Sequence, residues 1–317
     1  MDLSKHLILN KYFLNLFGFD RIQDFFNTLK EIPEGFHSGG NSHFLDKILQ
    51  LENLKLSPDE VIRYDLAIKE YSEKLSKNRR ENINLKYFQY FAILFTEIFL
   101  DRYFNRRKQF LSELNSFVDD LNKEAITEEQ KFDSFNEKDL TKLAYWMATG
   151  SGKTLIMHIN YWQFLKYCSE KIDNIILVTP NEGLSLQHSK EMRKSGILCS
   201  VYLESPDSIS LHKNEVLIID IHKLTKEKKG EGVRVEVDYF QGKNLVFIDE
   251  GHKGAGTEEK TWKNLREKLA EKGFIFEYSA TFGQVIGPQD KDLLKEYSKA
   301  IIFDYSYKYF YTDGYGK

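Results

Sequence analysis

The sequence contains few cysteines, no excess of positive charge and no long apolar run. Only Cys168 and Cys199 occur among 317 residues, and their spacing matches no metal site, which fits a reducing compartment. The formal net charge of −3 gives no global signature of a nucleic-acid binder, although a local groove could still be basic. No run is long enough to span a bilayer, and residues 1–16 lack the apolar core of a signal peptide. We therefore expect a cytoplasmic protein without a membrane partner.

The first 84 residues are predicted to form helices. Apolar residues recur at helical spacing at Leu7, Leu14 and Phe17. Further along, Ser57 and Pro58 form a helix start, with Ser57 as the N-cap and proline at the first helical position. We interpret residues 1–84 as an all-α accessory domain, and the charged stretch at 76–80 as a solvated linker that closes it.

A second helical region precedes the centre of the chain. Residues 85–100 are apolar on nearly all sides, which predicts a helix buried on most faces. Gln89 and Glu97 inside it therefore need polar partners, and for Glu97 we expect Arg102 or another basic residue. Residues 105–140 are predicted to form an amphipathic helical hairpin, inserted before the next strand.

The stretch at residues 143–157 has the pattern of a phosphate-binding P-loop. A short apolar strand leads into Thr149-Gly150-Ser151-Gly152-Lys153-Thr154, and a helix follows from about Thr154. The glycines allow successive backbone amides and the helix N-terminus to point at one anion. Lys153 would reach the β- and γ-phosphates, and the Thr154 hydroxyl would hold Mg²⁺. Met147 stands where the full pattern has a glycine.

After this helix, apolar strands alternate with helices. Such strands, apolar along their whole length, indicate a parallel sheet covered on both faces, an α/β fold in which ligands bind at the carboxyl ends of the strands. The strands are expected at 174–180, 197–202, 215–220, 244–250 and 274–279, and the helices near 182–194, 258–271 and 290–299.

Two polar clusters follow predicted strands. Asp249 and Glu250 end one apolar strand, and beside a P-loop an acidic pair of this kind can hold Mg²⁺ and deprotonate the attacking water. Ser279 and Thr281 follow the end of the next strand. We therefore predict that Asp249, Glu250 and Lys153 are catalytic, and that Thr154 and Asp249 are the metal ligands.

At this point the sequence resembles the superfamily 2 helicases and translocases, and within them the ATP-driven subunits of type I and type III restriction systems. The spelling of residues 147–154 is familiar in that group, which accounts for Met147. Asp-Glu-Gly-His at 249–252 resembles motif II of the DEAD/DEAH-box proteins, and Ser-Ala-Thr at 279–281 resembles motif III, which links ATP hydrolysis to nucleic acid. Residues 85–317 are thereby expected to form the first RecA-like, ATP-binding domain.

The resemblance also implies a nucleic-acid track. Thr179, Pro180 and Asn181 resemble motif Ia, whose turn contacts the phosphate backbone, and His222 and Lys223 lie in a further strand-end motif on the same side. With them, His252, Ser279 and Thr281 are expected to bind nucleic acid or to couple it to hydrolysis. Gln89 occupies a place like that of the glutamine that reads adenine upstream of the P-loop, at a spacing that requires the insertion at 105–140.

Together these features predict the ATP-binding and hydrolysing half of a helicase or translocase that uses ATP and Mg²⁺ and acts on DNA, in restriction or anti-phage defence. An RNA helicase of the same superfamily, or an ATP-gated switch that clamps nucleic acid without translocation, are the alternatives. By resemblance, a second RecA-like domain beyond residue 317 would supply arginines to the ATP, so residues 1–317 alone are expected to hydrolyse ATP weakly or not at all. Restriction or defence subunits would be partners. A P-loop kinase is disfavoured, because the motifs at 249–252 and 279–281 lie where a motor needs them.

Overall fold

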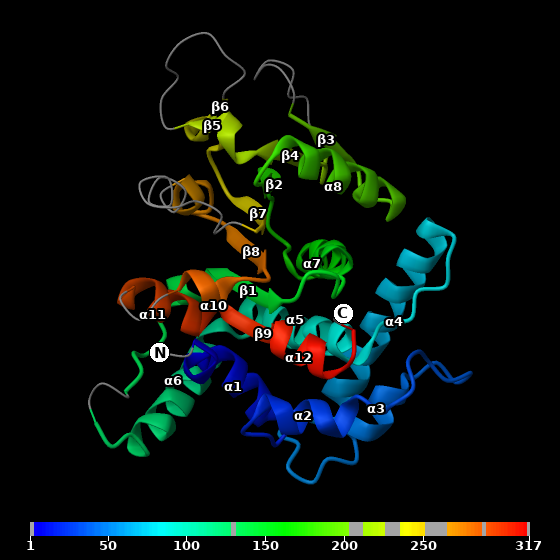
Figure 1. Ribbon diagram of the computed structural model, residues 1–317, viewed down its shortest axis with the longest axis vertical. Helices are drawn as coiled ribbons and strands as arrows, with labels where there is room; N and C mark the ends of the chain where they lie inside the picture. Colours follow the sequence, from blue (N-terminus) through cyan, green and yellow to red (C-terminus); the bar gives the residue numbers. More distant parts are fainter. Residues whose placement is uncertain are drawn as a thin grey trace.

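The computed structural model describes residues 3–127, 131–202, 212–225, 235–250, 265–286 and 290–315. Within these ranges, no helix combines the length and the apolar character that crossing a membrane requires. Figure 1 shows a parallel sheet that rises from β9 (Ile301–Tyr305) to β3 (Cys199–Val201), with the N-terminal helices packed below β9.

The N-terminal part consists of short helices followed by one long helix. A 3₁₀ turn, η1 (Leu3–His6), leads into α1 (Ile8–Leu16), α2 (Ile22–Leu29), α3 (His43–Ile48) and α4 (Pro58–Arg79). Ser57 caps α4 as predicted: its hydroxyl accepts from the Glu60 amide, and the Glu60 side chain accepts from the Ser57 amide. The large apolar residues of these helices share one core with α5 and β9. The division of the chain at residue 84 stays a prediction.

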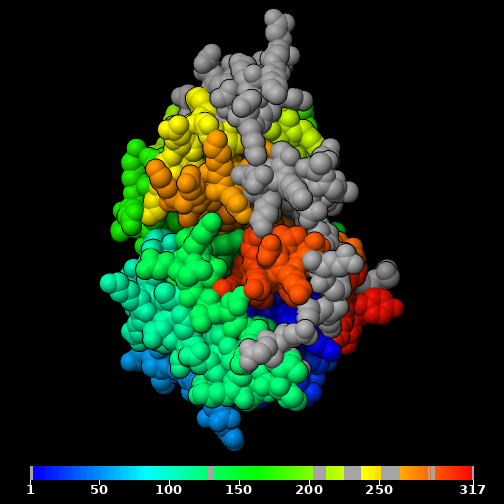
Figure 2. Space-filling model, turned by 90° about the vertical axis from the view of Figure 1, so that its left-hand side faces the viewer, coloured from blue at the N-terminus to red at the C-terminus, as the bar shows by residue number. Residues whose placement is uncertain are grey.

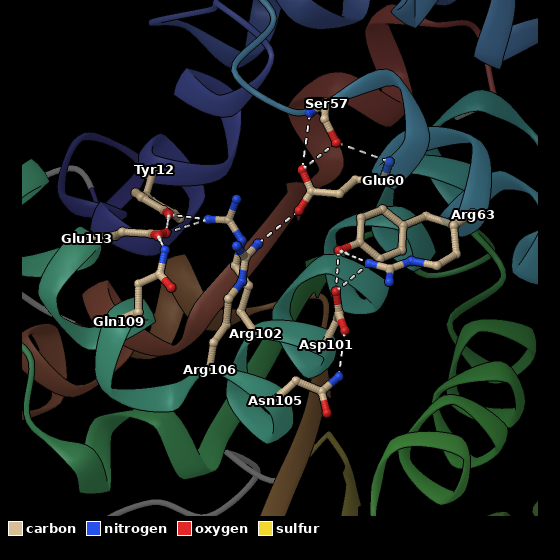
Figure 3. Close-up of polar contacts among 11 residues, drawn as sticks. Tyr12, Ser57, Glu60, Arg63, Asp101, Arg102, Asn105, Arg106, Gln109 and Glu113 are labelled. Atoms are coloured by element: carbon tan, nitrogen blue, oxygen red, sulfur yellow. Dashed lines mark hydrogen bonds and ion pairs between the residues drawn. The ribbon is translucent and has the colours of Figure 1, made fainter.

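The next helix, α5 (Tyr87–Asn105), is buried on nearly all sides, as its sequence predicts. It packs between α4, α6 (Arg107–Lys123), α7 and β9. Its carboxyl-terminal turns carry charged residues that fasten the neighbouring helices, as Figure 3 shows. Asp101 accepts from Arg63 of α4 at 2.8 Å, and Arg102 pairs with Glu113 of α6 at 3.0 Å. Further back, the buried Glu97 pairs with Lys166 at 2.6 Å, a basic partner other than Arg102.

The central sheet has seven parallel strands in the order β3-β4-β2-β7-β8-β1-β9. Their bounds are β1 (Lys142–Met147), β2 (Asn174–Thr179), β3 (Cys199–Val201), β4 (Val216–Asp220), β7 (Asn244–Asp249), β8 (Phe274–Ser279) and β9 (Ile301–Tyr305). The two-residue strands β5 (Leu224–Thr225) and β6 (Val235–Glu236) pair separately. The expected α/β fold with a parallel sheet covered by helices is confirmed.

Both faces of the sheet are covered. Alternate residues of β2 enter two different cores: Ile175 and Leu177 pack with α5 and α7 (Lys153–Tyr167), and Ile176 and Val178 pack on the opposite face. α8 (Glu182–Lys194) lies on the face of α7. The opposite face is covered in part by α10 (Phe282–Val285) and α11 (Lys291–Ala300). Figure 2 shows α11 in red-orange, between the orange segment 265–286 above and α6 below.

Two local expectations were wrong, and one strand was missed. In the described part of residues 105–140, the structure has one α-helix, α6, and the start of the 3₁₀ turn η3 (Glu137–Thr141), where a helical hairpin was predicted. The stretch 76–80 ends α4 and is no linker, because residues 76–79 are helical and the Arg79 side chain, 8% exposed, pairs with Glu191 of α8 at 2.7 Å. The strand β9 was not predicted. It follows α11 without a loop, and it pairs with β1.

Candidate functional site: a phosphate-binding loop beside an acidic strand end

The loop between β1 and α7 has the conformation that its glycines allow. Gly150 and Gly152 have φ of 86° and 88°, in the left-handed region that other residues rarely adopt. Ser151 is buried, and both its amide and its hydroxyl donate to the carbonyl of Ala148. Thr149 and Gly150 are exposed at the tip. The first amides of α7 have no carbonyl within the helix to bond, so the loop presents donors to an anion.

Gln89 lies directly against this loop. Its side-chain amide donates to the Ser151 carbonyl at 2.9 Å, and its oxygen accepts from the Lys86 amide at 3.0 Å. A Cβ added at Gly152 would lie 2.3 Å from Gln89 Nε2, so another residue there would displace the Gln89 amide and would also be strained at a φ of 88°. Gln89 is thus part of the wall of the loop, although it is far from Lys153 in the sequence.

Lys153 begins α7 and points toward the acidic end of β7. Its Nζ donates to the Met147 carbonyl at 3.1 Å and lies 3.3 Å from Glu250 Oε1. Its side chain and that of Glu250 are both largely buried, at 11% and 13% exposed. The ammonium therefore lies where the P-loop meets the acidic strand end.

Glu250 follows β7 in an unusual backbone conformation. Its φ is 54°, which costs a residue with a Cβ roughly 1 kcal/mol or more. The Glu250 amide donates to the Tyr278 carbonyl of β8 at 2.8 Å, which anchors the turn. Strain of this kind is found at functional sites, where the surrounding structure holds the residue in place.

Ser279 and Thr281 join this acidic end because β8 lies between β1 and β7. The Ser279 hydroxyl donates to Glu250 Oε2 at 3.2 Å and accepts from the Thr281 amide at 2.9 Å. Trp146, at the end of β1, donates from its indole nitrogen to the Ala280 carbonyl at 3.2 Å. The segment 279–281 is thereby linked both to the acidic turn and to the strand that precedes the P-loop.

One residue of this region was missed by sequence reasoning. His188 of α8 is buried, and its Nε2 lies 2.9 Å from Asp249 Oδ2. A single histidine on a helix gives no sequence signal for such a contact, because the contact depends on how α8 packs on the sheet.

The donor set fits a phosphate chain with a hard cation. Thr154 and Asp249 offer a hydroxyl and a carboxylate, the oxygen ligands that Mg²⁺ prefers, and Mg²⁺ in phosphate sites takes only one or two such protein ligands. The described residues contain no cluster of three or more histidine, cysteine or acidic side chains suited to a metal. The loop amides and Lys153 would hold the phosphates.

The proposed nucleic-acid track lies further along the same edge. Thr179 pairs in register with Asp220, so the turns after β2 and β4 are neighbours. Thr179 is fully buried and its hydroxyl is bonded to Ser185, so it shapes the turn and cannot reach a ligand. Asn181 is exposed and caps α8 by accepting from the Leu184 amide. Pro180 is half-buried between them.

The second turn presents a different surface. His222 is exposed, and its amide donates to Asp220. The Lys223 side chain is 16% exposed, and its Nζ donates to Glu182 Oε2 in the first turn of α8 at 3.1 Å and to the Tyr202 carbonyl at 3.3 Å. His252, which was also predicted for this track, lies outside the described residues.

Two solved structures share a distant similarity with the chain. One is the SWI2/SNF2 ATPase core of Sulfolobus solfataricus in complex with double-stranded DNA, with 15% identity and a TM-score of 0.38 over 61% of this chain and 35% of that one. The other is the UvsW helicase of bacteriophage T4, with 14% identity and a TM-score of 0.38 over 62% of this chain and 71% of that one. The chain thus spans about a third of the first structure. No curated protein sequence matches it.

A family model matches more than half of the chain. The family is described as "Type III restriction enzyme, res subunit", and the match runs over residues 118–284. That range includes the P-loop, the acidic strand end and the segment 279–281, and it excludes Gln89. The chain belongs to the type III restriction enzyme res subunit family, and it contains a superfamily 2 helicase-like ATPase domain.

Proposed function

We propose that this chain binds and hydrolyses ATP with Mg²⁺, and that it uses the cycle to move along or separate DNA in restriction or anti-phage defence. The observation that carries the proposal is the convergence of Lys153, Glu250 and Ser279 at the carboxyl edge of β1, β7 and β8, with 3.3 Å from Lys153 to Glu250 and 3.2 Å from Ser279 to Glu250. Separate elements supply a phosphate cradle, a cation, a carboxylate and a hydroxyl to one point.

Each residue then has a role in phosphoryl transfer to water. Lys153 and the loop amides would bind the phosphates and stabilise the charge that develops on them. Thr154 and Asp249 would hold Mg²⁺, which supplies further neutralisation when bound. Glu250 would accept a proton from the attacking water, which its position beside Lys153 permits. Ser279 is bonded to Glu250, so a change in the position or protonation of that carboxylate would alter the conformation of the segment 279–281.

The track for nucleic acid would run over Asn181, His222 and Lys223, with Thr179 shaping the first turn. These residues lie at the same edge of the sheet as the ATP site, since β2 and β4 continue the parallel array beyond β7. On binding, the Lys223 ammonium would leave Glu182 and pair with a phosphate of the nucleic acid, which the length of the lysine side chain permits. The contacts would be to the backbone of the nucleic acid, so they would set affinity and register and leave base sequence unread.

The test measures binding to single-stranded and duplex DNA and to RNA of matched sequence. Binding is measured by fluorescence anisotropy, with and without a non-hydrolysable ATP analogue. We expect nucleotide-dependent binding to DNA. Tighter binding to RNA would favour the RNA helicase alternative. Nucleotide-gated retention without strand displacement or movement, measured on a labelled duplex, would favour the clamp. Failure to bind any of these nucleic acids would reject the proposal.

A further inference from the structure

Among the described residues, the buried side chain of His188 on α8 has one hydrogen-bond partner, and that partner is the proposed metal ligand. His188 is 4% exposed, and its Nε2 lies 2.9 Å from Asp249 Oδ2. A carboxylate can only accept hydrogen bonds, so the imidazole must carry its proton on Nε2 and donate to Asp249. The other ring nitrogen, Nδ1, is buried and has no hydrogen-bond partner among the described residues. Within the described part of the chain, the polar contact of the ring is therefore directed to Asp249.

The helix that carries His188 is itself fixed at its start. Asn181 caps α8 by accepting from the Leu184 amide at 2.9 Å, and the hydroxyls of Thr179 and Ser185 are 2.6 Å apart. His188 lies in the second turn of α8, about 9 Å along the axis from the helix start at Glu182. The imidazole is thus supported by an anchored helix that packs on the same face of the sheet as α7.

We propose that His188 is a positioning residue for Asp249: it orients the carboxylate for Mg²⁺ by donating a hydrogen bond to Oδ2. Carboxylates that bind metals are commonly hydrogen-bonded in turn, and loss of such a partner typically weakens metal affinity about 10- to 100-fold. Without the donor, Asp249 would also be left with a largely buried oxygen and no partner for it. The inference rests on the proposed function, because it requires Asp249 to serve Mg²⁺–ATP.

Three substitutions of His188 separate positioning from packing. His188→Gln places an amide N–H near the position of Nε2, so it should preserve the contact. His188→Leu fills a similar volume without a donor, and His188→Asn keeps a polar amide that is too short to reach Asp249. The matched control is His158→Gln, since His158 is also buried with an unpartnered nitrogen but is bonded to Ser195 and not to Asp249.

The measurement is the thermal shift produced by saturating ATP as Mg²⁺ is varied, together with the melting temperature without nucleotide. In His188→Leu and His188→Asn we expect the Mg²⁺ concentration that gives half of the maximal thermal shift to rise about 10-fold or more. In His188→Gln and in the His158→Gln control, that concentration should stay within about 3-fold of wild type. In an Asp249→Asn background the His188 substitutions should have no further effect, because the group on which they act is gone.

The outcomes are distinguishable. If the wild-type chain gives no Mg²⁺-dependent shift with ATP, the proposed function fails, and the role of His188 fails with it. If wild type responds, unchanged Mg²⁺ dependence in both His188→Leu and His188→Asn overturns the positioning role alone. An equal loss of Mg²⁺ affinity in His188→Gln and His188→Leu would also overturn the positioning role. That result would show that the packing of the imidazole ring matters and that its hydrogen-bond donor does not. Should the Leu variant not fold, the comparison of Asn with Gln decides.

Discussion

Lys153 Nζ lies 3.3 Å from Glu250 Oε1, so the P-loop lysine and the carboxylate that follows β7 form an ion pair. The two residues come from different elements and meet only because β1, β8 and β7 are parallel neighbours. A nucleotide that enters the loop must share Lys153 with Glu250. The pair therefore connects phosphate binding to the residue proposed to activate water, and it motivates the first two predictions.

Lys153→Ala should abolish binding of ATP–Mg²⁺. The substitution removes the ammonium that begins α7, 3.1 Å from the Met147 carbonyl and 3.3 Å from Glu250 Oε1. For wild type, ATP at about 100 times its dissociation constant should stabilise the fold by roughly 2.7 kcal/mol. Thermal shift with and without ATP checks this, with Lys166→Ala at the other end of α7 as a control. Equal responses of wild type and Lys153→Ala to ATP would refute the P-loop assignment.

In the full-length protein, Glu250→Gln should retain ATP affinity and lose hydrolysis. Glutamine keeps the size of the side chain and a hydrogen-bonding group for Ser279, but it cannot accept the proton of the attacking water. Affinity is measured by titration with a fluorescent ATP analogue, and hydrolysis by phosphate release in the presence of nucleic acid. Phosphate release at the wild-type rate would exclude Glu250 as the base, and a loss of affinity would point to a structural role.

Gln89→Ala should weaken ATP binding and reduce the preference for ATP over GTP. The amide now bonds to the Ser151 carbonyl and the Lys86 amide, so it lies beside the loop, where an adenine could meet it. Both effects are measured by competition titrations, in which ATP or GTP displaces a fluorescent nucleotide from wild type and from Gln89→Ala. If the affinities for the two nucleotides fall by the same factor, Gln89 supports the loop and does not read the base.

Lys223→Ala should lower the magnitude of the salt slope of nucleic-acid binding by about one unit, whatever the base sequence. For wild type the log–log slope should be roughly −2 to −4 on duplex, because a single domain contacts few phosphates. Lys243→Ala is the matched control: it removes the same charge and also breaks an ion pair, with Glu170, but it precedes β7 at the opposite edge of the sheet. Anisotropy at several salt concentrations decides, and an unchanged slope removes Lys223 from the track.

His158 should make the fold less stable as the pH falls below neutrality. Burial, with a smaller contribution from His188 and Arg79, lowers the pKa of His158 from 6.5 to about 3. Below about pH 6.5, His158 is protonated in the unfolded chain but stays neutral in the folded chain. The contribution of His158 to the free energy of unfolding is therefore fully present above that pH and is lost as the pH falls. Between pH 7 and pH 5 the loss should be about 2 kcal/mol.

Urea unfolding of wild type and His158→Gln at the two pH values checks this expectation. His158→Gln should have a flatter pH dependence by that amount, and the exposed His212→Gln should follow wild type. Identical pH dependence in wild type and His158→Gln would contradict the neutral, buried state of His158.

The sequence by itself determined the local parts of this protein. The P-loop is encoded by consecutive residues, because Gly150 and Gly152 must adopt positive φ between an apolar strand and a helix start. The start of α4 is similarly local, since Ser57 and Glu60 bond to each other's backbone. The parallel sheet follows from apolar strands that need cover on both faces. The strand ends and the acidic pair could therefore be predicted by residue number.

Only the tertiary structure decided which of these parts meet. Many strand orders would bury the same apolar faces, so the sequence could not place β8 between β1 and β7, which brings Ser279 to Glu250. Helix packing, which depends on residues far apart in the chain, brought Gln89 to Ser151, Arg79 to Glu191 and His188 to Asp249. Side chains of these types usually lie in solvent, and their burial here has no local pattern, because the partners that make it favourable come from other elements.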